Sequence, residues 1–220
     1  PIRAYLRHFH NQGIQTLVPT AELAQQLQTL GFHHTQVLAR GVDTARFSPQ
    51  RRDPDLRRQW GATPETLVAL YVGRLAAEKN LELVIAAFQA IRRVQPDARL
   101  ALVGDGPLAA RLRARHSDFA YCGMRQGVDL ATHYASADLF LFPSLTETFG
   151  NVVLEAMASG LAVAAFDYAA AHAHVEPGRS GWLAPFGDTE AFITQAAALA
   201  TDVASLRRMG ENARQAMLQV

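Results

Sequence analysis

Residues 67–103 read LVALYVGRLAAEKNLELVIAAFQAIRRVQPDARLALV, and this stretch decides the fold. An apolar run at residues 67–72 opens it, and a second at residues 99–103 closes it. Between the two runs, apolar side chains recur at spacings of three and four residues, at Leu81, Val84, Ile85, Phe88 and Ile91. That spacing predicts a helix, which Asn80 could cap. A strand, a helix and a strand in this order predict two parallel strands of one sheet.

The same alternation continues through most of the chain. Further apolar runs occupy residues 119–122, 139–142 and 161–166, and stretches of helical length separate them, at residues 108–115, 128–135, 152–158 and 189–199. Strands that are apolar along their whole length are typical of a parallel sheet buried on both faces. We therefore expect an α/β fold with a Rossmann-like, doubly wound parallel sheet.

The opening forty or so residues do not continue this alternation. Their pattern predicts a short strand at residues 16–18, a helix starting near Thr20 and another strand at residues 36–38. A charged stretch from Asp43 to Pro54 follows them. We expect residues 1–48 to be the tail of a preceding domain plus a linker, and residues 49–220 to be the main domain. Because the sequence opens on Pro1 and stops inside a helical pattern, we expect both ends to be cut from a longer chain, with a C-terminal helix truncated.

Composition narrows the possible functions. The content of hydrophobic residues is 49% and the formal net charge is +1, so nucleic acid is not an expected partner. No apolar run reaches the roughly 18 residues that a membrane-spanning helix needs. The single cysteine, Cys122, excludes an internal disulfide and favours a reducing, cytoplasmic location.

The loop after residues 67–72 carries two cations. Gly73 and Arg74 end the apolar run, and Lys79 follows just before the predicted helix. A guanidinium can bind phosphate oxygens through two donors, an ammonium adds a point charge, and a helix N-terminus attracts anions. Lys79 is also the one lysine among the 21 lysines and arginines. Either this position requires a compact ammonium rather than a guanidinium, or the lysine is there by chance. The loop indicates a diphosphate site, or else a solvated arginine and a lysine paired with Glu78.

The loop after residues 139–142 carries two glutamates, Glu147 and Glu155, around a helix start expected at Gly150 or Asn151. If the segment were helical throughout, the two would lie roughly 12 Å apart along the axis. That separation is comparable to the distance from a sugar to a ribose across a diphosphate. Carboxylates accept hydrogen bonds from vicinal hydroxyls, so one glutamate could bind the sugar and the other the ribose. The alternative is one glutamate favoured by the helix dipole and one that is solvated.

Two further loops follow predicted strands. The backbone of residues 122–127, including Gly123 and Met124, could bind the edge of a nucleobase, although a glycine turn is equally expected there on structural grounds. Residues 104–107, Gly-Asp-Gly-Pro, resemble a phosphate loop, but their composition favours a tight turn from strand to helix.

Other chemical patterns are better explained structurally. Asp53 and Asp55 have the D-x-D spacing of metal-dependent transferases, but they lie in an arginine-rich stretch, where a solvated turn is favoured. His172 and His174 lack a nearby acidic or cysteine partner, so a metal site is not expected. The arginines at residues 51, 52, 57 and 58 could contact anionic lipid, but the acidic residues among them favour a solvated face.

Taken together, these motifs resemble the retaining glycosyltransferases of family 4, the group 1 transferases of the GT-B fold. The family signature places a second glutamate eight positions after the first, and Glu147 and Glu155 match it within the sequence Thr-Glu-Thr-Phe-Gly. Five other motifs stand in the family's order: Gly41-Val-Asp43 with Phe47, Gly73-Arg74 with Glu78-Lys79, Val103-Gly-Asp-Gly-Pro107, Ala137-Asp138, and Glu155-Ala-Met-Ala-Ser-Gly160. The resemblance runs from about Val18 to Leu199.

The resemblance implies a set of roles for these residues. Arg74 and Lys79 would neutralise the leaving diphosphate, Glu147 would contact the transferred sugar and Glu155 would bind the ribose hydroxyls. The sugar and phosphate site would be lined by Thr148, Phe149, Gly150, Asn151 and Val152. The resemblance also implies that this chain is the C-terminal donor-binding domain and that the reaction needs no metal or other cofactor. The acceptor, a lipid or glycan, would bind an N-terminal domain, so the chain alone would be inactive.

Finer features narrow the branch and leave alternatives. Residues 134–138, 155–163 and 167–171 look like the branch of GDP-mannose-dependent α-mannosyltransferases and sulfoquinovosyl transferases, whose acceptors are diacylglycerol-type lipids. GDP-mannose is therefore the favoured donor, a UDP-sugar stays possible, and the complete protein would contact the inner membrane face peripherally. The alternatives are a nucleotide-binding module without turnover and a nucleotide-sugar epimerase or phosphorylase-like enzyme of the same fold. A dinucleotide oxidoreductase is disfavoured because no G-x-G-x-x-G follows a strand.

Overall fold

The computed structural model describes residues 2–38, 40–147 and 149–220. The chain divides into two compact units, Pro1–Gly41 and Val42–Val220. The boundary falls at residue 41 rather than at the expected residue 48, because the intervening residues pack onto the larger unit. Phe47 is buried there, and Arg214 donates hydrogen bonds to the carbonyls of Phe47 (2.8 Å) and Thr44 (3.0 Å).

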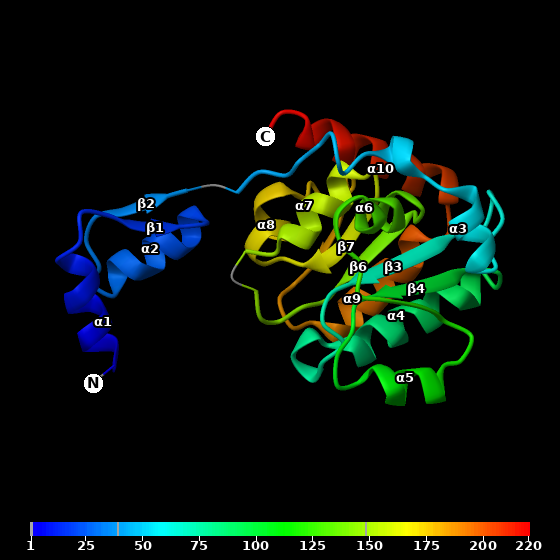
Figure 1. Ribbon diagram of the computed structural model, residues 1–220, viewed down its shortest axis with the longest axis horizontal. Helices are drawn as coiled ribbons and strands as arrows, with labels where there is room; N and C mark the ends of the chain where they lie inside the picture. The colour runs from blue at the N-terminus through cyan, green and yellow to red at the C-terminus, as the bar shows by residue number, and fades with distance from the viewer. Residues whose placement is uncertain (1, 39, 148) are drawn as a thin grey trace. The chain divides into compact units, whose positions relative to one another are not determined.

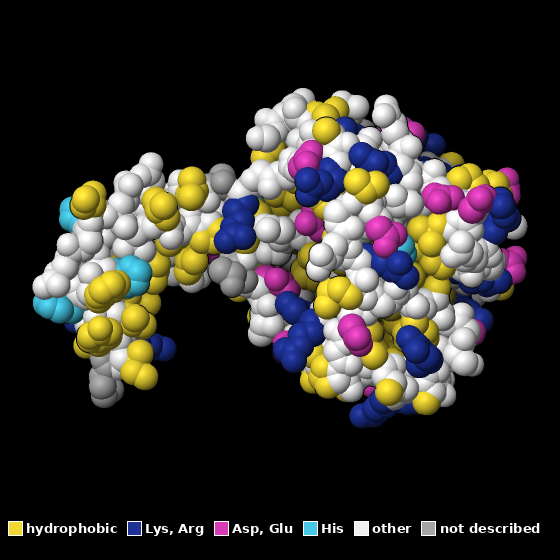
Figure 2. Space-filling model, viewed as in Figure 1, with side chains coloured by type: hydrophobic (Ala, Val, Ile, Leu, Met, Phe, Trp, Pro, Cys, Tyr) yellow, Lys and Arg dark blue, Asp and Glu magenta, His cyan; other side chains and the backbone are white. Residues whose placement is uncertain are grey.

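The smaller unit contains two helices and two parallel strands: α1 (Ile2–Asn11), β1 (Thr16–Val18), α2 (Ala21–Thr29) and β2 (Thr35–Val37). Thr20 caps α2, because its hydroxyl oxygen accepts a hydrogen bond from the Leu23 N–H at 3.1 Å. Helix α1 carries an apolar face with Tyr5 and Phe9 exposed, and Figure 2 shows the hydrophobic side chains on this unit's surface.

The larger unit is built on a fully parallel sheet, as predicted, and this sheet has six strands. Its strands are β3 (Val68–Val72), β4 (Arg99–Val103), β5 (Ala120–Gly123), β6 (Leu139–Phe142), β7 (Ala162–Phe166) and β8 (Gly181–Ala184). Their spatial order is β5-β4-β3-β6-β7-β8, the 3-2-1-4-5-6 order of the Rossmann fold. The order reverses between β3 and β6, and ligands of such sheets bind at the carboxyl ends of the strands beside this reversal. Strand β8 was not predicted from the sequence.

Helices cover both faces of the sheet (Figure 1). One face carries α4 (Leu81–Val94), α5 (Ala109–Arg115) and α9 (Thr189–Leu199). The other carries α6 (Gly127–Ala135), α7 (Asn151–Ala158), α8 (Ala169–His174) and α10 (Val203–Met217). The core lies between these layers, and every residue of β3, β6 and β7 is buried. This burial explains why those strands are apolar along their whole length.

Part of the arginine-rich stretch packs against the core, and our expectation of a solvated face is wrong for two of its arginines. Arg57, on the short helix α3 (Pro54–Gln59), is 3% exposed, and its Nη1 lies 3.3 Å from Oδ2 of Asp138. Arg52 Nη2 lies 2.8 Å from Oδ1 of the same carboxylate, whose side chain is 1% exposed. Asp138 also accepts the N–H of Val68 at 2.9 Å. The arginines therefore neutralise a buried carboxylate that anchors the start of β3.

Asp53 and Asp55 serve the same helix rather than a metal. The Asp53 carboxylate accepts the N–H groups of Asp55 (2.8 Å) and Leu56 (3.2 Å), which makes it the N-cap of α3. Asp55 pairs with the exposed Arg58 at 2.5 Å. The solvated turn expected here is therefore a capped helix start.

Candidate functional site

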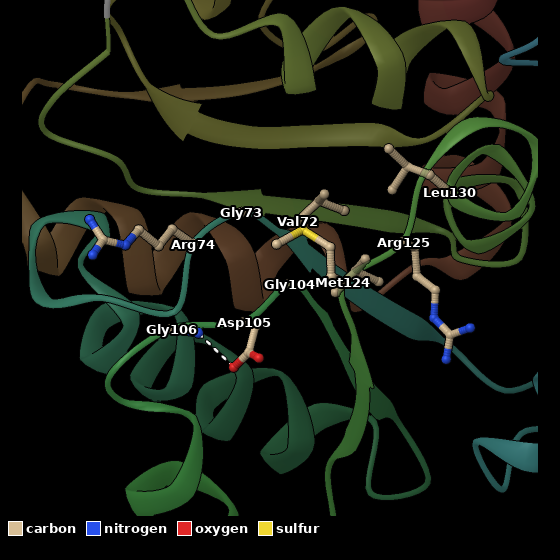
Figure 3. Close-up of a pocket in the computed structure, with 10 residues that line it drawn as sticks. Val72, Gly73, Arg74, Gly104, Asp105, Gly106, Met124, Arg125 and Leu130 are labelled. Carbon is tan, nitrogen blue, oxygen red and sulfur yellow. Dashed lines mark hydrogen bonds between the residues drawn. The ribbon is translucent and has the colours of Figure 1, made fainter.

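A cavity of about 720 Å³ opens at the carboxyl ends of β3, β4 and β5. It is lined by the last residue of β3 and the two that follow it (72–74), by the last residue of β4 and the three that follow it (103–106), by Met124 and Arg125 after β5, and by Leu130 of α6. Figure 3 shows Arg74 and Arg125 at opposite ends of this group, with Gly104 and Met124 between them. The cavity thus brings together the predicted site residues Gly73, Arg74 and Met124.

Two glycines allow the floor of the cavity to form. A Cβ atom on Gly104 would lie 2.0 Å from the Gly73 carbonyl oxygen, and one on Gly106 would lie 2.5 Å from that of Leu75. Two backbone hydrogen bonds join the loops after β3 and β4: the Gly73 N–H donates to the Val103 carbonyl (3.0 Å), and the Leu75 N–H donates to the Asp105 carbonyl (2.9 Å). The Asp105 carboxylate accepts the Gly106 N–H at 2.7 Å (Figure 3). The tight turn expected at residues 104–107 is therefore also a wall of the cavity.

Residues 104–106, Arg125 and Leu130 were not among the predicted site residues. The rule that placed Arg74 in the site applied equally to residues 104–106, because they follow the neighbouring strand. Leu130 could not be identified in this way, since an apolar residue on a helix is expected to pack in the core.

Arg74 lies at the exposed end of the site. Its side chain is 66% exposed, and its Nη1 lies 3.4 Å from Oε1 of Glu78. The Arg74 carbonyl accepts a hydrogen bond from the buried Tyr71 hydroxyl at 3.1 Å, which fixes the backbone at this point. Since an exposed pair of this kind contributes little free energy, Arg74 can exchange Glu78 for an anionic ligand at small cost.

Lys79 pairs with Glu147, not with Glu78 as one interpretation of the sequence had it. Lys79 Nζ lies 2.5 Å from Oε1 of Glu147, and the two side chains are 20% and 15% exposed. The Ser144 hydroxyl donates to the same oxygen at 2.7 Å, and Lys79 also donates to the carbonyl of Thr146 at 3.2 Å. Lys79 follows β3 and Glu147 follows β6, so the pair spans the point where the strand order reverses.

Other contacts join the same two loops. Asn80 has a left-handed backbone (φ 55°), and its side chain donates to the Pro143 carbonyl at 3.3 Å. Asn80 occupies the N-cap position of α4 as expected, but its side chain binds the neighbouring loop and makes no capping hydrogen bond to the first N–H groups of the helix. The Tyr168 hydroxyl donates to the carbonyl of Glu147 at 3.0 Å. Glu147 is thus held through both its backbone and its carboxylate.

Helix α7 begins at Asn151, with Gly150 as its N-cap residue at φ 94°, as predicted. Glu147 lies before the helix, so the 12 Å separation expected for a continuous helix does not apply. Phe149 is buried, and its ring packs edge-on against His174 with centroids 6.2 Å apart. Asn151 and Val152 form the first turn, and Thr148 lies outside the described residues.

Glu155 lies on the second turn of α7 and is half-buried. The Tyr134 hydroxyl donates to its Oε2 at 2.9 Å. Burial raises the pKa of Glu155 above its ordinary value, and the hydrogen bond from Tyr134 partly opposes that rise. Eight of the predicted residues that the structure describes do not line the 720 Å³ cavity: Lys79, Gly123, Glu147, Phe149, Gly150, Asn151, Val152 and Glu155. The Gly123 carbonyl instead accepts a hydrogen bond from the Gly104 N–H at 2.8 Å.

The two histidines of α8 have separate surroundings. His172 Nδ1 lies 2.6 Å from Oδ1 of Asp167, whereas His174 lies against Phe149. Within residues 2–38, 40–147 and 149–220, no group of three or more histidine, cysteine or acidic side chains is arranged to hold a metal ion. Over the same residues, no helix combines the length and the apolar character that crossing a membrane requires.

Comparisons with known proteins identify the family. Residues 66–202 match the family model described as glycosyl transferases group 1. The GDP-mannose-dependent alpha-mannosyltransferase of Mycobacterium tuberculosis is 38% identical over 197 residues, which cover 89% of this chain and 50% of that protein. The sulfoquinovosyl transferase SQD2 of Arabidopsis thaliana is 33% identical over 224 residues, which cover 98% of this chain and 43% of that protein. The chain thus spans about half the length of the curated relatives it matches.

Solved structures agree on the fold. The sucrose-phosphate synthase of Thermosynechococcus elongatus superposes with a TM-score of 0.83 at 25% identity, over 99% of this chain and 56% of that one. The Anabaena protein HepE, solved with UDP and glucose, gives a TM-score of 0.81 at 22% identity, over 99% and 62%. The chain therefore belongs to the group 1 glycosyl transferases, and its larger unit has the Rossmann-like fold predicted for their donor-binding domain.

Proposed function

We propose that the chain is the donor-binding half of a retaining glycosyltransferase. It would bind a nucleoside diphosphate sugar, GDP-mannose being favoured, for transfer of the hexosyl group to a lipid or glycan acceptor. The observation that carries this proposal is the Lys79–Glu147 pair at the reversal of strand order, beside the cavity that Arg74 lines.

The two cations are the proposed diphosphate ligands. Each of them is paired with a carboxylate in the structure, Arg74 with Glu78 and Lys79 with Glu147. A diphosphate carries more negative charge than one carboxylate, so it would draw both cations to itself. As the bond between the sugar and the diphosphate breaks, negative charge grows on the diphosphate, which is the leaving group. The two cations would stabilise this charge. The two side chains would neutralise the diphosphate without a metal ion.

The carboxylates have complementary proposed roles. Once Lys79 moves to the phosphate, Glu147 keeps the Ser144 hydrogen bond and can accept hydroxyls of the transferred sugar. Glu155 accepts the ribose hydroxyls, and the base lies in the cavity near Gly123 and Met124. The free N–H groups in the first turn of α7, at Asn151 and Val152, would bind the phosphate and the sugar.

The donor is proposed from the relatives. Three mycobacterial mannosyltransferases described as GDP-mannose-dependent are 33 to 38% identical to this chain, and they support GDP-mannose as the donor. The complex of HepE with UDP and glucose supports a UDP-sugar as the second candidate. A lipid acceptor, peripheral membrane contact and a cytoplasmic location remain predictions from the sequence.

A donor screen by thermal unfolding tests this proposal on residues 1–220. A ligand that binds only the folded chain raises the melting temperature, and at equal concentration the ligand with the higher affinity raises it more. We expect GDP-mannose to raise it more than UDP-glucose or UDP-sulfoquinovose at equal concentration, with free mannose as the inactive control. A melting temperature that none of the nucleotide sugars changes would refute a donor site. A larger rise with a UDP-sugar would refute the preference for GDP-mannose.

A further inference from the structure

Tyr134 lies in a fully buried position on α6, among aromatic side chains. Its ring packs edge-on against Phe47 and tilted against Phe140, with centroids 5.7 and 5.9 Å apart. Its hydroxyl donates to Oε2 of Glu155 on α7 at 2.9 Å. Among the described residues, this carboxylate is the hydroxyl's one hydrogen-bond partner.

The hydroxyl is informative because the rest of its surroundings are apolar. Phenylalanine would fill the same space, and a buried hydroxyl without a partner costs roughly 1–3 kcal/mol. Burial also raises the pKa of Tyr134 well above its ordinary value, so the group stays protonated and acts as a donor. A hydrogen bond to a carboxylate is short and directional, and it therefore fixes how the Glu155 carboxylate is turned.

The same helix forms part of the cavity wall. Leu130, which lines the cavity, precedes Tyr134 by four residues and so lies on the same side of α6. Met124 and Arg125 lie in the loop that leads into this helix. One rigid element thus connects the cavity to the Glu155 carboxylate, although Glu155 itself does not line the cavity.

We propose that Tyr134 is a positioning residue, which holds Glu155 in the orientation that accepts the two vicinal hydroxyls of the donor's ribose. With Oε2 bound by Tyr134, Oε1 has no donor among the described residues and is available to one hydroxyl. The second lone pair of Oε2 is available to the other hydroxyl. This inference rests on the proposed function, since it requires a nucleotide in the site.

Removing either hydrogen-bonding group tests the inference. Residues 1–220 and the Tyr134→Phe variant would be titrated by calorimetry with GDP and with 2′,3′-dideoxy-GDP, and in parallel with the two uridine counterparts. We expect the unmodified chain to prefer the ribose form by about tenfold or more. Tyr134→Phe should lower that preference to about threefold or less and leave the affinity for the dideoxy form unchanged within about twofold.

Tyr121→Phe is the matched control. The Tyr121 hydroxyl donates to the His116 carbonyl at 3.1 Å. The variant therefore also loses one tyrosine hydrogen bond, but outside the proposed site. This variant should keep the full preference for ribose.

Each other outcome has a defined meaning. An unchanged preference in Tyr134→Phe overturns the positioning role, and so does an equal loss for both nucleotides, which would mark a purely structural tyrosine. Binding without any ribose preference in the unmodified chain overturns the inference while leaving the donor site intact. Binding of neither GDP nor UDP refutes the proposed function and the inference with it.

Discussion

At the scale of single residues, the oxygen Oε1 of Glu147 is the point where the site is most tightly organised. Lys79 and Ser144 both donate to it, at 2.5 and 2.7 Å, and the Ser144 side chain is buried. If a diphosphate draws Lys79 away, as we propose, Ser144 is the donor that remains on this oxygen. We therefore expect Ser144 to hold the orientation of Glu147 when the donor is bound.

Ser144→Ala should weaken the binding of the sugar more than that of the nucleotide. We expect the preference for GDP-mannose over GDP to fall by about tenfold or more, which corresponds to one hydrogen bond to a charged group. Calorimetric titration with both ligands measures it. Ser159→Ala is the control, because Ser159 is also buried and its hydroxyl has no partner in the described structure. Equal losses in the two variants would show that Ser144 does not act through Glu147.

Glu155 connects function to stability. Burial raises its pKa, so the folded chain holds a carboxylate that would be better solvated after unfolding. A group whose pKa is raised by folding favours the folded state at low pH, and this contribution disappears as pH rises through the folded-state pKa. At neutral pH the charged Glu155 therefore costs stability.

Glu155→Gln should raise the melting temperature at pH 7 and remove most nucleotide affinity. The glutamine amide oxygen can still accept the Tyr134 hydrogen bond, but it carries no charge to desolvate. The stability gain should shrink as pH is lowered through the pKa of Glu155, where the wild-type side chain takes up a proton. Thermal unfolding at a series of pH values measures this, with the exposed Glu190→Gln as control. A gain that does not change with pH would contradict the account.

At the scale of the elements, the sequence predicted five of the six strands of the sheet and missed β8, at one edge. Strands β4 and β6 match the predicted residues, because continuous apolar runs are required where both faces of a strand are covered. Strand β8 was missed, since Gly181, Trp182, Leu183 and Ala184 give no long apolar run and two of the four are only half-buried. Strand β5 is also only partly buried, but its apolar run is long enough to have been predicted.

The arginine-rich stretch was misinterpreted for a related reason. Arg57 belongs to a segment whose local composition is charged, yet its partner Asp138 lies far along the chain. Only the fold brings them together, so a pattern limited to neighbouring residues indicates a solvated surface instead. The same holds for the Lys79–Glu147 pair, whose members the sequence identified separately.

Asp138→Ala should be strongly destabilising, because it leaves the buried Arg57 charge without its carboxylate. Loss of one partner of a buried pair costs roughly 3–5 kcal/mol of unfolding free energy. Asp118→Ala removes an exposed partner of Arg92, a pair 2.6 Å apart, and should cost less than about 1 kcal/mol. Urea unfolding of both variants measures the difference. Similar costs for the two would contradict the structural role of Asp138.

At the scale of the whole molecule, strand order is what assembles the candidate site. The sequence identified Arg74, Lys79 and Glu147 one loop at a time, and the 3-2-1-4-5-6 order brings the loops after β3 and β6 side by side. The cavity itself needed the structure, since its walls include glycines and apolar residues that carry no chemical signature. Residues 1–220 alone should bind nucleotide but transfer no sugar, because the family resemblance assigns the acceptor site to another domain.

The most direct test of the donor site is calorimetric titration of residues 1–220 with GDP and with UDP. We predict measurable binding of at least one nucleotide, weakened about tenfold or more by Arg74→Ala and by Lys79→Ala because each removes a charged phosphate ligand. Arg92→Ala, which removes an arginine that pairs with Asp118 outside the site, should bind like the unmodified chain. No heat of binding with either nucleotide, or equal affinity in all four proteins, would contradict the donor-site assignment.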